Sequence, residues 1–195
     1  FRGMELVVQN RTPEDAAQIV ERICGVCPVS HAHASSIAGD KAYGITISNN
    51  ARIVRNLLEG AQFLHSHILW LYNLAALDYV NPLNALQANV DDAYAVALEN
   101  GLALHSDLNQ LYEKLAAFAD NGQLSIFSGN WFDADGGEAY VDNPEANLIL
   151  TSHYLEALKM QARSSEMAAL LGGKMPHVMT SIPGGNMWAP TQSKL

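Results

Sequence analysis

The sequence predicts a mainly α-helical fold, organised as a bundle of long antiparallel helices. In 51–78, 89–119 and 144–171, apolar residues recur at spacings of three and four, which places them on one face of a helix. Connections with Asn, Asp and Gly separate these stretches, as between antiparallel neighbours in helix bundles. Two regions depart from the pattern: a short extended or β segment at the N-terminus and a loop-rich region around 122–143.

The composition narrows the function classes. With 195 residues, 49% of them hydrophobic, the chain can fill the core of one domain or of a large part of one. Lys and Arg number 11 against 20 Asp and Glu, and the net charge of −9 argues against a surface that binds nucleic-acid phosphates. The longest strongly apolar run, 68–77, is too short to cross a bilayer, and we expect no transmembrane segment.

The first helices are predicted from their start signals. Thr12 is a good N-cap, Pro13 suits the first helical position, and Asp15 follows three residues after the cap. Pro28 can open a second helix, with Cys27 near its cap. The segment that contains the cysteines therefore lies in a turn between two helices.

The only two cysteines of the chain, Cys24 and Cys27, form a Cys-x-x-Cys pair. Two sulfurs at this spacing can chelate one metal, and soft sulfur favours copper(I), zinc, iron–sulfur and nickel-type centres. The positive end of the second helix is expected to help Cys27 lose its proton. His31 lies one helical turn after Cys27, where its imidazole could donate to a sulfur or to a metal-bound group.

Four other interpretations of the cysteine pair are open. A thioredoxin-like redox pair needs a strand before the motif, where a helix is predicted instead. A c-type haem site needs His directly after the second cysteine, where this chain has Pro28. A structural zinc site needs two more ligands, and His31 and His33 follow Cys27 too closely for the usual spacing. A disulfide requires an oxidising compartment.

The long helix predicted over 51–78 contains two histidines. Residues 48–50, Ser-Asn-Asn, are good caps and predict one continuous helix over 51–78, about 42 Å long at 1.5 Å per residue. His65 and His67 lie two positions apart in this helix and point in different directions. We interpret them as core or interface histidines and not as a metal pair.

The remaining helices are predicted from periodicity and end signals. Residues 89–119 are expected to form one amphipathic helix, which 120–122 ends. Residues 143–144, Asn-Pro, predict the start of the last helix, Gly-Gly at 172–173 predicts its end, and the tail 175–195 is expected to be loop. The inward face of the 89–119 helix is predicted to consist of Ala93, Ala97, Gly101, Leu104, Leu108, Leu111, Leu115 and Phe118.

Two segments are predicted not to be helical. Residues 5–8, Glu-Leu-Val-Val, are expected to form an edge strand. Region 122–143 holds turn signals and room for a short hairpin. Its acidic residues Asp133, Asp135 and Glu138 lack the spacing of an EF-hand loop, so we interpret them as a solvated turn.

Several motifs resemble the large subunit of a nickel-iron hydrogenase. The most specific is Glu-Arg-Ile-Cys-Gly-Val-Cys-x-x-x-His at 21–31. The resemblance continues over nearly the whole chain, with matching stretches at 1–5, 75–80, 144–148, 153–158 and 172–177.

The resemblance implies a metal centre and a reaction. In this family four cysteines hold nickel, and two of them bridge to an iron that carries cyanide and carbon monoxide. By motif match, Cys24 would be a terminal nickel ligand, Cys27 a nickel-iron bridge and His31 a hydrogen-bond donor beside them, while Glu5 would bind magnesium. The implied activity is heterolytic cleavage or formation of H2. An iron–sulfur small subunit would pass electrons to an acceptor.

The chain departs from the family pattern in two places. It has two cysteines where the complete centre needs four, so we expect 1–195 to be part of a single large-subunit domain, truncated at both ends and inactive alone. Ser66 stands where some relatives carry a carboxylate. The alternatives are a non-catalytic hydrogenase-related helical subunit, a class that generally lacks these cysteines, and a small zinc-stabilised helical protein.

Overall fold

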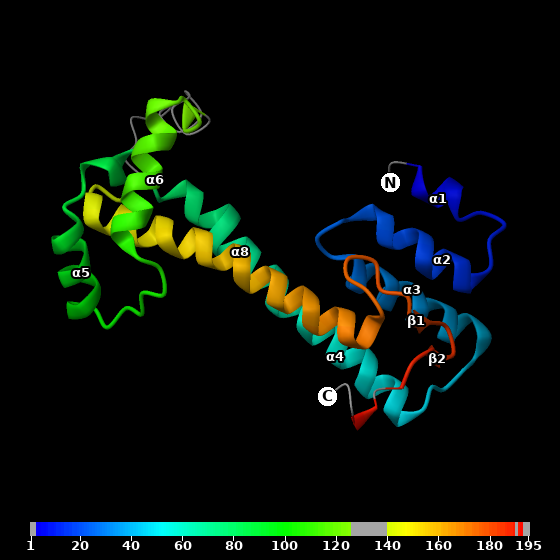
Figure 1. The fold of residues 1–195 in the computed structure, drawn as a ribbon. Helices are drawn as coiled ribbons and strands as arrows, with labels where there is room; N and C mark the ends of the chain where they lie inside the picture. Colours follow the sequence, from blue (N-terminus) through cyan, green and yellow to red (C-terminus); the bar gives the residue numbers. More distant parts are fainter. Residues whose placement is uncertain (1–2, 126–139, 190, 193–195) are drawn as a thin grey trace. The chain divides into compact units, whose positions relative to one another are not determined.

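The computed structural model describes residues 3–125, 140–189 and 191–192, and it confirms the mainly α-helical prediction (Figure 1). The chain forms two compact units. The first consists of Phe1–His67 and Gln161–Leu195, and the second of Ile68–Met160. No helix among the described residues is both long enough and apolar enough to cross a membrane.

The first unit contains the cysteine motif. Its elements are α1 (Met4–Val7), α2 (Pro13–Val20), the 3-10 turn η1 (Glu21–Ile23), α3 (Pro28–Tyr43), α4 (Asn49–Ile68), the C-terminal part of α8 (Pro144–Gly172), and the strands β1 (Ser181–Ile182) and β2 (Gly185–Asn186). The strands pair antiparallel, with Ser181 opposite Asn186 and Ile182 opposite Gly185. Figure 1 shows this small hairpin beside α3, which it contacts.

Side chains at the predicted caps begin three helices. Thr12 Oγ1 accepts a hydrogen bond from the Asp15 N–H at 3.2 Å, at the start of α2. Ser48 Oγ accepts from the Ala51 N–H at 3.2 Å before α4. Asn143 Oδ1 accepts from the Ala146 N–H at 2.7 Å before α8. These contacts satisfy N–H groups that have no partner inside the helix, and they confirm the predicted starts.

A buried ion pair joins α3, α4 and the hairpin. Arg55 on α4 donates to Asp40 Oδ2 on α3 at 2.6 Å. The same guanidinium donates to the Gly185 carbonyl at 3.0 Å and to the Ile182 carbonyl at 2.6 Å. The Gly184 N–H donates to Asp40 Oδ1 at 2.7 Å. Both charges are thus hydrogen-bonded, as buried charges in proteins usually are.

Two glycines allow close packing in the first unit. A Cβ on Gly39 of α3 would lie 2.5 Å from Pro183 Cγ in the turn of the hairpin. A Cβ on Gly172 would lie 2.5 Å from Val178 Cγ1. Val178 belongs to the apolar core of the unit, which also includes Val29, Ala32, Val54 and Leu58.

The second unit is a separate helical core. Its elements are the π-helix η2 (Leu69–Leu74), the 3-10 turns η3 (Ala75–Asp78) and η4 (Asn84–Gln87), α5 (Val90–Glu99), α6 (Leu108–Asp120) and the N-terminal part of α8. The core consists mainly of alanines and leucines from these elements: Ala85, Ala88, Ala93, Ala97, Leu108, Leu111, Leu115, Leu124, Leu148 and Ile149.

Two long helices were predicted with wrong boundaries. The single α-helix predicted over 51–78 ends at Ile68, and η2 and η3 follow it. Leu74, at the junction of η2 and η3, has φ −120° and ψ −73°, outside the α region, so no α-helix runs on through this position. The helix predicted over 89–119 is two helices, because Gly101 with φ +63° follows α5 and Asp107 caps α6.

Other sequence predictions need smaller corrections. Residues 5–8 do not form a strand: the N–H groups of Leu6 and Val7 bond to the Gly3 carbonyl and close one helical turn. The tail is not all loop, since it contains β1 and β2. Phe118, predicted to point inward, is 44% exposed, and Gly101 is also exposed.

The structure describes only part of the predicted loop-rich region 122–143. Residues 126–139, with the predicted hairpin and the acidic residues Asp133, Asp135 and Glu138, lie outside the described residues.

Replacing Arg55 with Leu should destabilise the first unit by about 3–5 kcal/mol, because Asp40 would remain as an uncompensated buried charge. Urea unfolding followed by circular dichroism measures this change. Arg52→Leu, one turn earlier and exposed on the same helix, is the matched control and should change stability by less than about 0.5 kcal/mol. Equal effects of the two substitutions would contradict the assigned role of Arg55.

The stability contributed by Asp40 should depend on pH. Burial favours the neutral carboxyl, but the hydrogen bonds from Arg55 and the Gly184 N–H outweigh it and hold the pKa of Asp40 below its usual value. The ion pair therefore stabilises the fold above about pH 3.9 and is lost as pH falls through the lowered folded-state pKa. Asp40→Asn should be less stable than wild type at pH 7, and urea midpoints of the two proteins should converge below about pH 4.

Candidate metal centre

The two cysteines lie in one turn between η1 and α3. Cys24 follows η1 in extended conformation, with φ −142°, and Cys27 is the N-cap residue of α3, with φ −122°. No disulfide joins them, and each thiol is partly exposed. The Cys27 N–H donates to Cys24 Sγ at 3.3 Å. The turn therefore folds back so that the backbone of the second cysteine contacts the sulfur of the first.

The start of α3 anchors this turn to the core. Pro28 occupies the first helical position, where its missing N–H costs nothing, and it is buried. The next residue, Val29, is part of the apolar core. The position of Cys27 is thus determined by the packing of α3, as the predicted helix start at Pro28 required.

Polar side chains from α4 contact the cysteine turn and the first turns of α3. Gln62 Nε2 donates to the Val26 carbonyl at 2.7 Å. Ser30 Oγ donates to Glu59 Oε1 at 2.6 Å, and His33 Nδ1 lies 3.6 Å from Glu59 Oε2. Periodicity had not singled out Glu59 or Gln62. Their spacing of three residues, which places both side chains on one side of the helix, was the available signal.

The pKa of the Cys27 thiol differs from the sequence prediction. Burial, the hydrogen bond to Cys24, the charge of Cys24 and finally the negative charge of Glu59 together raise the pKa of Cys27 to about 11. We predicted easier proton loss at the helix N-terminus, and that prediction was wrong for the metal-free protein. Loss of hydration and the interaction with the Cys24 thiol favour the neutral thiol of Cys27, although it lies at a helix N-terminus.

Glu59 itself is held in the charged form. The nearby imidazole of His33, 3.6 Å from Oε2, and the hydrogen bond from Ser30 lower the pKa of Glu59, against the opposing effect of burial. The cysteine turn is therefore flanked by a negative charge, a property that favours a cation beside the sulfurs.

A second acid lies just before the cysteines. Glu21 is completely buried, and neither carboxylate oxygen has a hydrogen-bond partner among the described residues. Burial raises the pKa of Glu21 to about 8, although the charges of Arg22 and Lys174 oppose the shift. Glu21 is therefore mostly protonated at neutral pH, and it was not among the predicted site residues.

Of the other residues considered in the sequence analysis, only some lie near the cysteine turn. His31 lies in the first turn of α3, where its backbone N–H donates to the Cys27 carbonyl at 3.4 Å. Glu5 lies exposed on α1. His67 Nδ1 contacts the Phe63 carbonyl at 2.8 Å, whereas the Nδ1 of half-buried His65 is enclosed without a hydrogen-bond partner among the described residues. The two histidines thus have different surroundings, in line with their interpretation as a non-chelating pair.

The ligand set fits half of a four-sulfur site. In the described part of the chain, no group of three or more His, Cys, Asp or Glu side chains is placed to hold a metal ion. Cys24 and Cys27 offer two soft donor atoms on one turn, and a four-coordinate metal would need two further ligands. A self-contained zinc site, which usually needs four ligands, fits this part of the chain less well.

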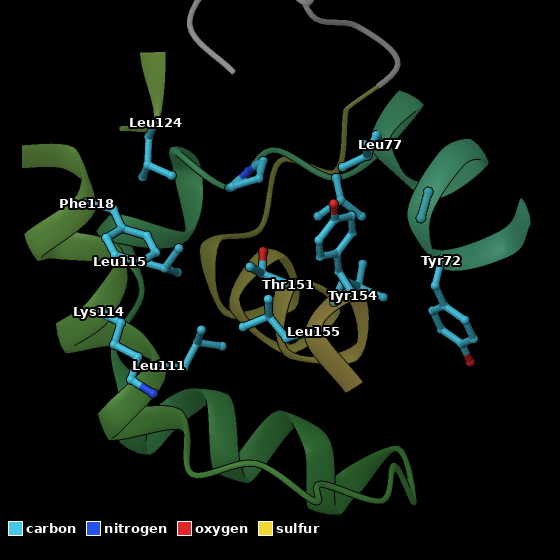
Figure 2. A pocket seen from close by; sticks show the side chains of 14 residues that line it. Tyr72, Leu77, Leu111, Lys114, Leu115, Phe118, Leu124, Thr151, Tyr154 and Leu155 are labelled. Atoms are coloured by element: carbon cyan, nitrogen blue, oxygen red, sulfur yellow. The ribbon is translucent and has the colours of Figure 1, made fainter. Parts of the chain in front are cut away.

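A separate pocket lies in the second unit (Figure 2). Figure 2 shows Leu111, Leu115 and Phe118 from α6 around it, together with Thr151 and Leu155 from α8. Nearly all the lining side chains are apolar, and the polar atoms come from Lys114, Thr151 and two tyrosines. Among the described residues, the lining contains no cysteine, histidine or carboxylate, and we assign no metal chemistry to it.

In the metal-free protein, Cys27 should react slowly with iodoacetamide, because a thiol with a pKa of about 11 holds little thiolate at pH 8. We expect a rate more than about tenfold below that of an unstructured peptide spanning 21–31. Peptide mass spectrometry over time measures it, and in urea the difference should vanish. Equal rates in folded protein and peptide would contradict the raised pKa.

Comparison with known proteins places the chain in a family. A family model described as nickel-dependent hydrogenase matches residues 2–194. The Hydrogenase-2 large chain of Escherichia coli (strain K12) is 40% identical over 190 residues, which cover 95% of this chain and 33% of the relative. The uptake hydrogenase large subunit of Rhodobacter capsulatus is 39% identical over 181 residues, covering 91% of this chain and 30% of the relative.

Solved structures agree with the family match. The Ni-Fe-Se hydrogenase from Desulfovibrio vulgaris Hildenborough, in the as-isolated oxidized state, has a TM-score of 0.71 at 34% identity and matches 100% of this chain and 31% of that one. A reduced, active form from Desulfomicrobium baculatum has a TM-score of 0.65 at 35% identity, over 100% of this chain and 33% of that one. The chain thus spans about a third of these relatives. It belongs to the nickel-dependent hydrogenase family.

Proposed function

We propose that the chain supplies two of the four sulfur ligands of a nickel-iron centre in a hydrogenase large subunit. Cys24 is assigned as a terminal nickel ligand and Cys27 as the bridge between nickel and iron. The observation that carries this assignment is the folded-back turn, in which the Cys27 N–H contacts Cys24 Sγ at 3.3 Å. Two sulfurs held on one turn are suited to binding a single soft metal.

The residues around the turn prepare these sulfurs for metal. Because burial and the neighbouring thiol of Cys24 raise the pKa of Cys27 to about 11, its proton leaves when a metal cation binds and not before. The carboxylate of Glu59 stays charged and favours cation entry. When bound, the nickel-iron pair supplies the soft acid that polarises H2 for heterolytic cleavage or formation.

His31 and Glu5 receive supporting roles. His31, one helical turn after Cys27, is assigned as a hydrogen-bond donor toward the centre. Glu5 is assigned as a magnesium ligand, an assignment that rests on motif similarity and on the preference of magnesium for carboxylate oxygens. Cyanide and carbon monoxide are assigned as the remaining iron ligands by the same similarity.

The proposal includes a partner and a larger domain. The names of the relatives, large chain and large subunit, imply a smaller subunit beside them. We assign an iron–sulfur small subunit, which takes electrons from H2 and passes them to an acceptor. The two compact units would then be parts of one large-subunit domain.

The alternatives fit the structure less well. A non-catalytic hydrogenase-related subunit would not need the cysteine pair, which here is retained in a folded turn. A zinc-stabilised helical protein would need further ligands near the turn, and the described residues provide no group of three. Zinc at one equivalent, with unfolding on chelation, would favour that alternative.

Cys27→Ser in the complete enzyme should abolish H2-dependent dye reduction and lower the nickel and iron content, because a hydroxyl is a poor soft-metal ligand. The large subunit should still accumulate, since Cys27 is only partly buried. Dye reduction and metal analysis of the purified complex measure both effects.

The matched control is Ala38→Ser, which adds a hydroxyl at an exposed position of the same helix, α3. It should leave metal content and turnover unchanged. Near-normal activity of Cys27→Ser, or a wild-type complex purified without air that contains no nickel, would refute the proposed function.

A further inference from the structure

Gln62 on α4 is a buried polar side chain with a specific arrangement of contacts. Its side chain is 1% exposed. The amide nitrogen donates to the Val26 carbonyl at 2.7 Å and to Ser66 Oγ at 2.9 Å. The amide oxygen is buried and has no hydrogen-bond partner among the described residues.

The direction of this amide is determined by its surroundings. A backbone carbonyl only accepts hydrogen bonds, so the nitrogen of Gln62 must face Val26. The oxygen is thereby turned away and left unsatisfied, an arrangement that costs folding free energy. An apolar side chain of the same shape would avoid that cost. The contact to Val26 therefore points to a purpose other than stability.

The Val26 carbonyl belongs to the peptide unit that joins Val26 to Cys27. Val26 C=O and Cys27 N–H lie in one rigid plane. The oxygen of this unit accepts from Gln62 at 2.7 Å, and its N–H donates to Cys24 Sγ at 3.3 Å. A side chain on α4 is thus connected to the sulfur of Cys24 through a single peptide unit.

We propose that Gln62 is a positioning residue for the metal centre: it holds the Val26–Cys27 peptide so that the Cys27 N–H stays directed at the sulfur of Cys24. Hydrogen bonds to a ligating sulfur withdraw charge from it and tune the metal. Without Gln62 the carbonyl loses its buried donor, and the peptide plane is free to rotate. The expected effect on the metal rests on the proposed function. The effect of Gln62 on the orientation of the Val26–Cys27 peptide does not.

Gln62→Met in the complete enzyme tests the proposal, because methionine has similar length but no donor. The amide hydrogen of Cys27 should exchange at least about tenfold faster in hydrogen-exchange mass spectrometry of the peptide covering 24–28. The g-values of the nickel electron paramagnetic resonance signal should shift. Nickel retention against a chelator, or turnover per nickel, should fall about 10- to 100-fold.

Leu58→Ala is the matched control for general destabilisation. Leu58 is buried on the same helix, four residues earlier, and packs in the apolar core. This variant should lower the thermal midpoint of unfolding. It should change neither the nickel signal nor the exchange rate of the Cys27 amide relative to that of neighbouring amides. If Gln62→Met does not accumulate, Gln62→Leu serves, since leucine cannot donate to Val26 either.

The outcomes separate this proposal from the proposed function. Unchanged Cys27 exchange and an unchanged nickel signal in the Gln62 variant would overturn the positioning role and leave the nickel assignment intact. A wild-type enzyme without nickel would overturn the proposed function. In that case, faster Cys27 exchange in the variant would still support the hold of Gln62 on the peptide.

Discussion

The buried pair of Arg55 and Asp40 is the constraint on which the first unit depends. The guanidinium reaches Asp40 on α3 and the carbonyls of Ile182 and Gly185 in the hairpin, so one side chain connects three segments that are distant in sequence. Two buried charges are costly unless their hydrogen-bonding groups find partners, and here the backbone provides them. Helix α4, which carries Arg55, is thereby held against α3, which begins at the cysteine turn.

The same helix carries the polar groups that contact the cysteine turn. Seven residues after Arg55, Gln62 reaches the Val26 carbonyl, and Glu59 lies between them in sequence and contacts Ser30 and His33. Around Cys27, burial and the neighbouring thiol of Cys24 raise the pKa, and the negative charge of Glu59 adds a smaller effect in the same direction. The turn thus keeps a protonated thiol in a site that favours a cation, which suits a ligand that releases its proton only to a metal.

Local signals explain which parts of the fold were predictable. The helix starts at Thr12, Ser48 and Asn143 were predicted because a cap bonds an N–H only three residues away. The change of helix type after Ile68 has no such local signal, since apolar periodicity continues across it. The split near Gly101 was missed for the opposite reason, because periodicity was followed through a residue that ends helices.

The sequence by itself determined the cysteine spacing, the helix start at Pro28 and the family, since each of these depends on residues close together in the chain or on recognisable motifs. Only the tertiary structure decided which side chains surround the sulfurs. Gln62 contacts Val26 across 36 positions, and Arg55 contacts Gly185 across 130. Such contacts depend on how helices pack, and packing is a property of the whole unit that no local pattern of residues contains.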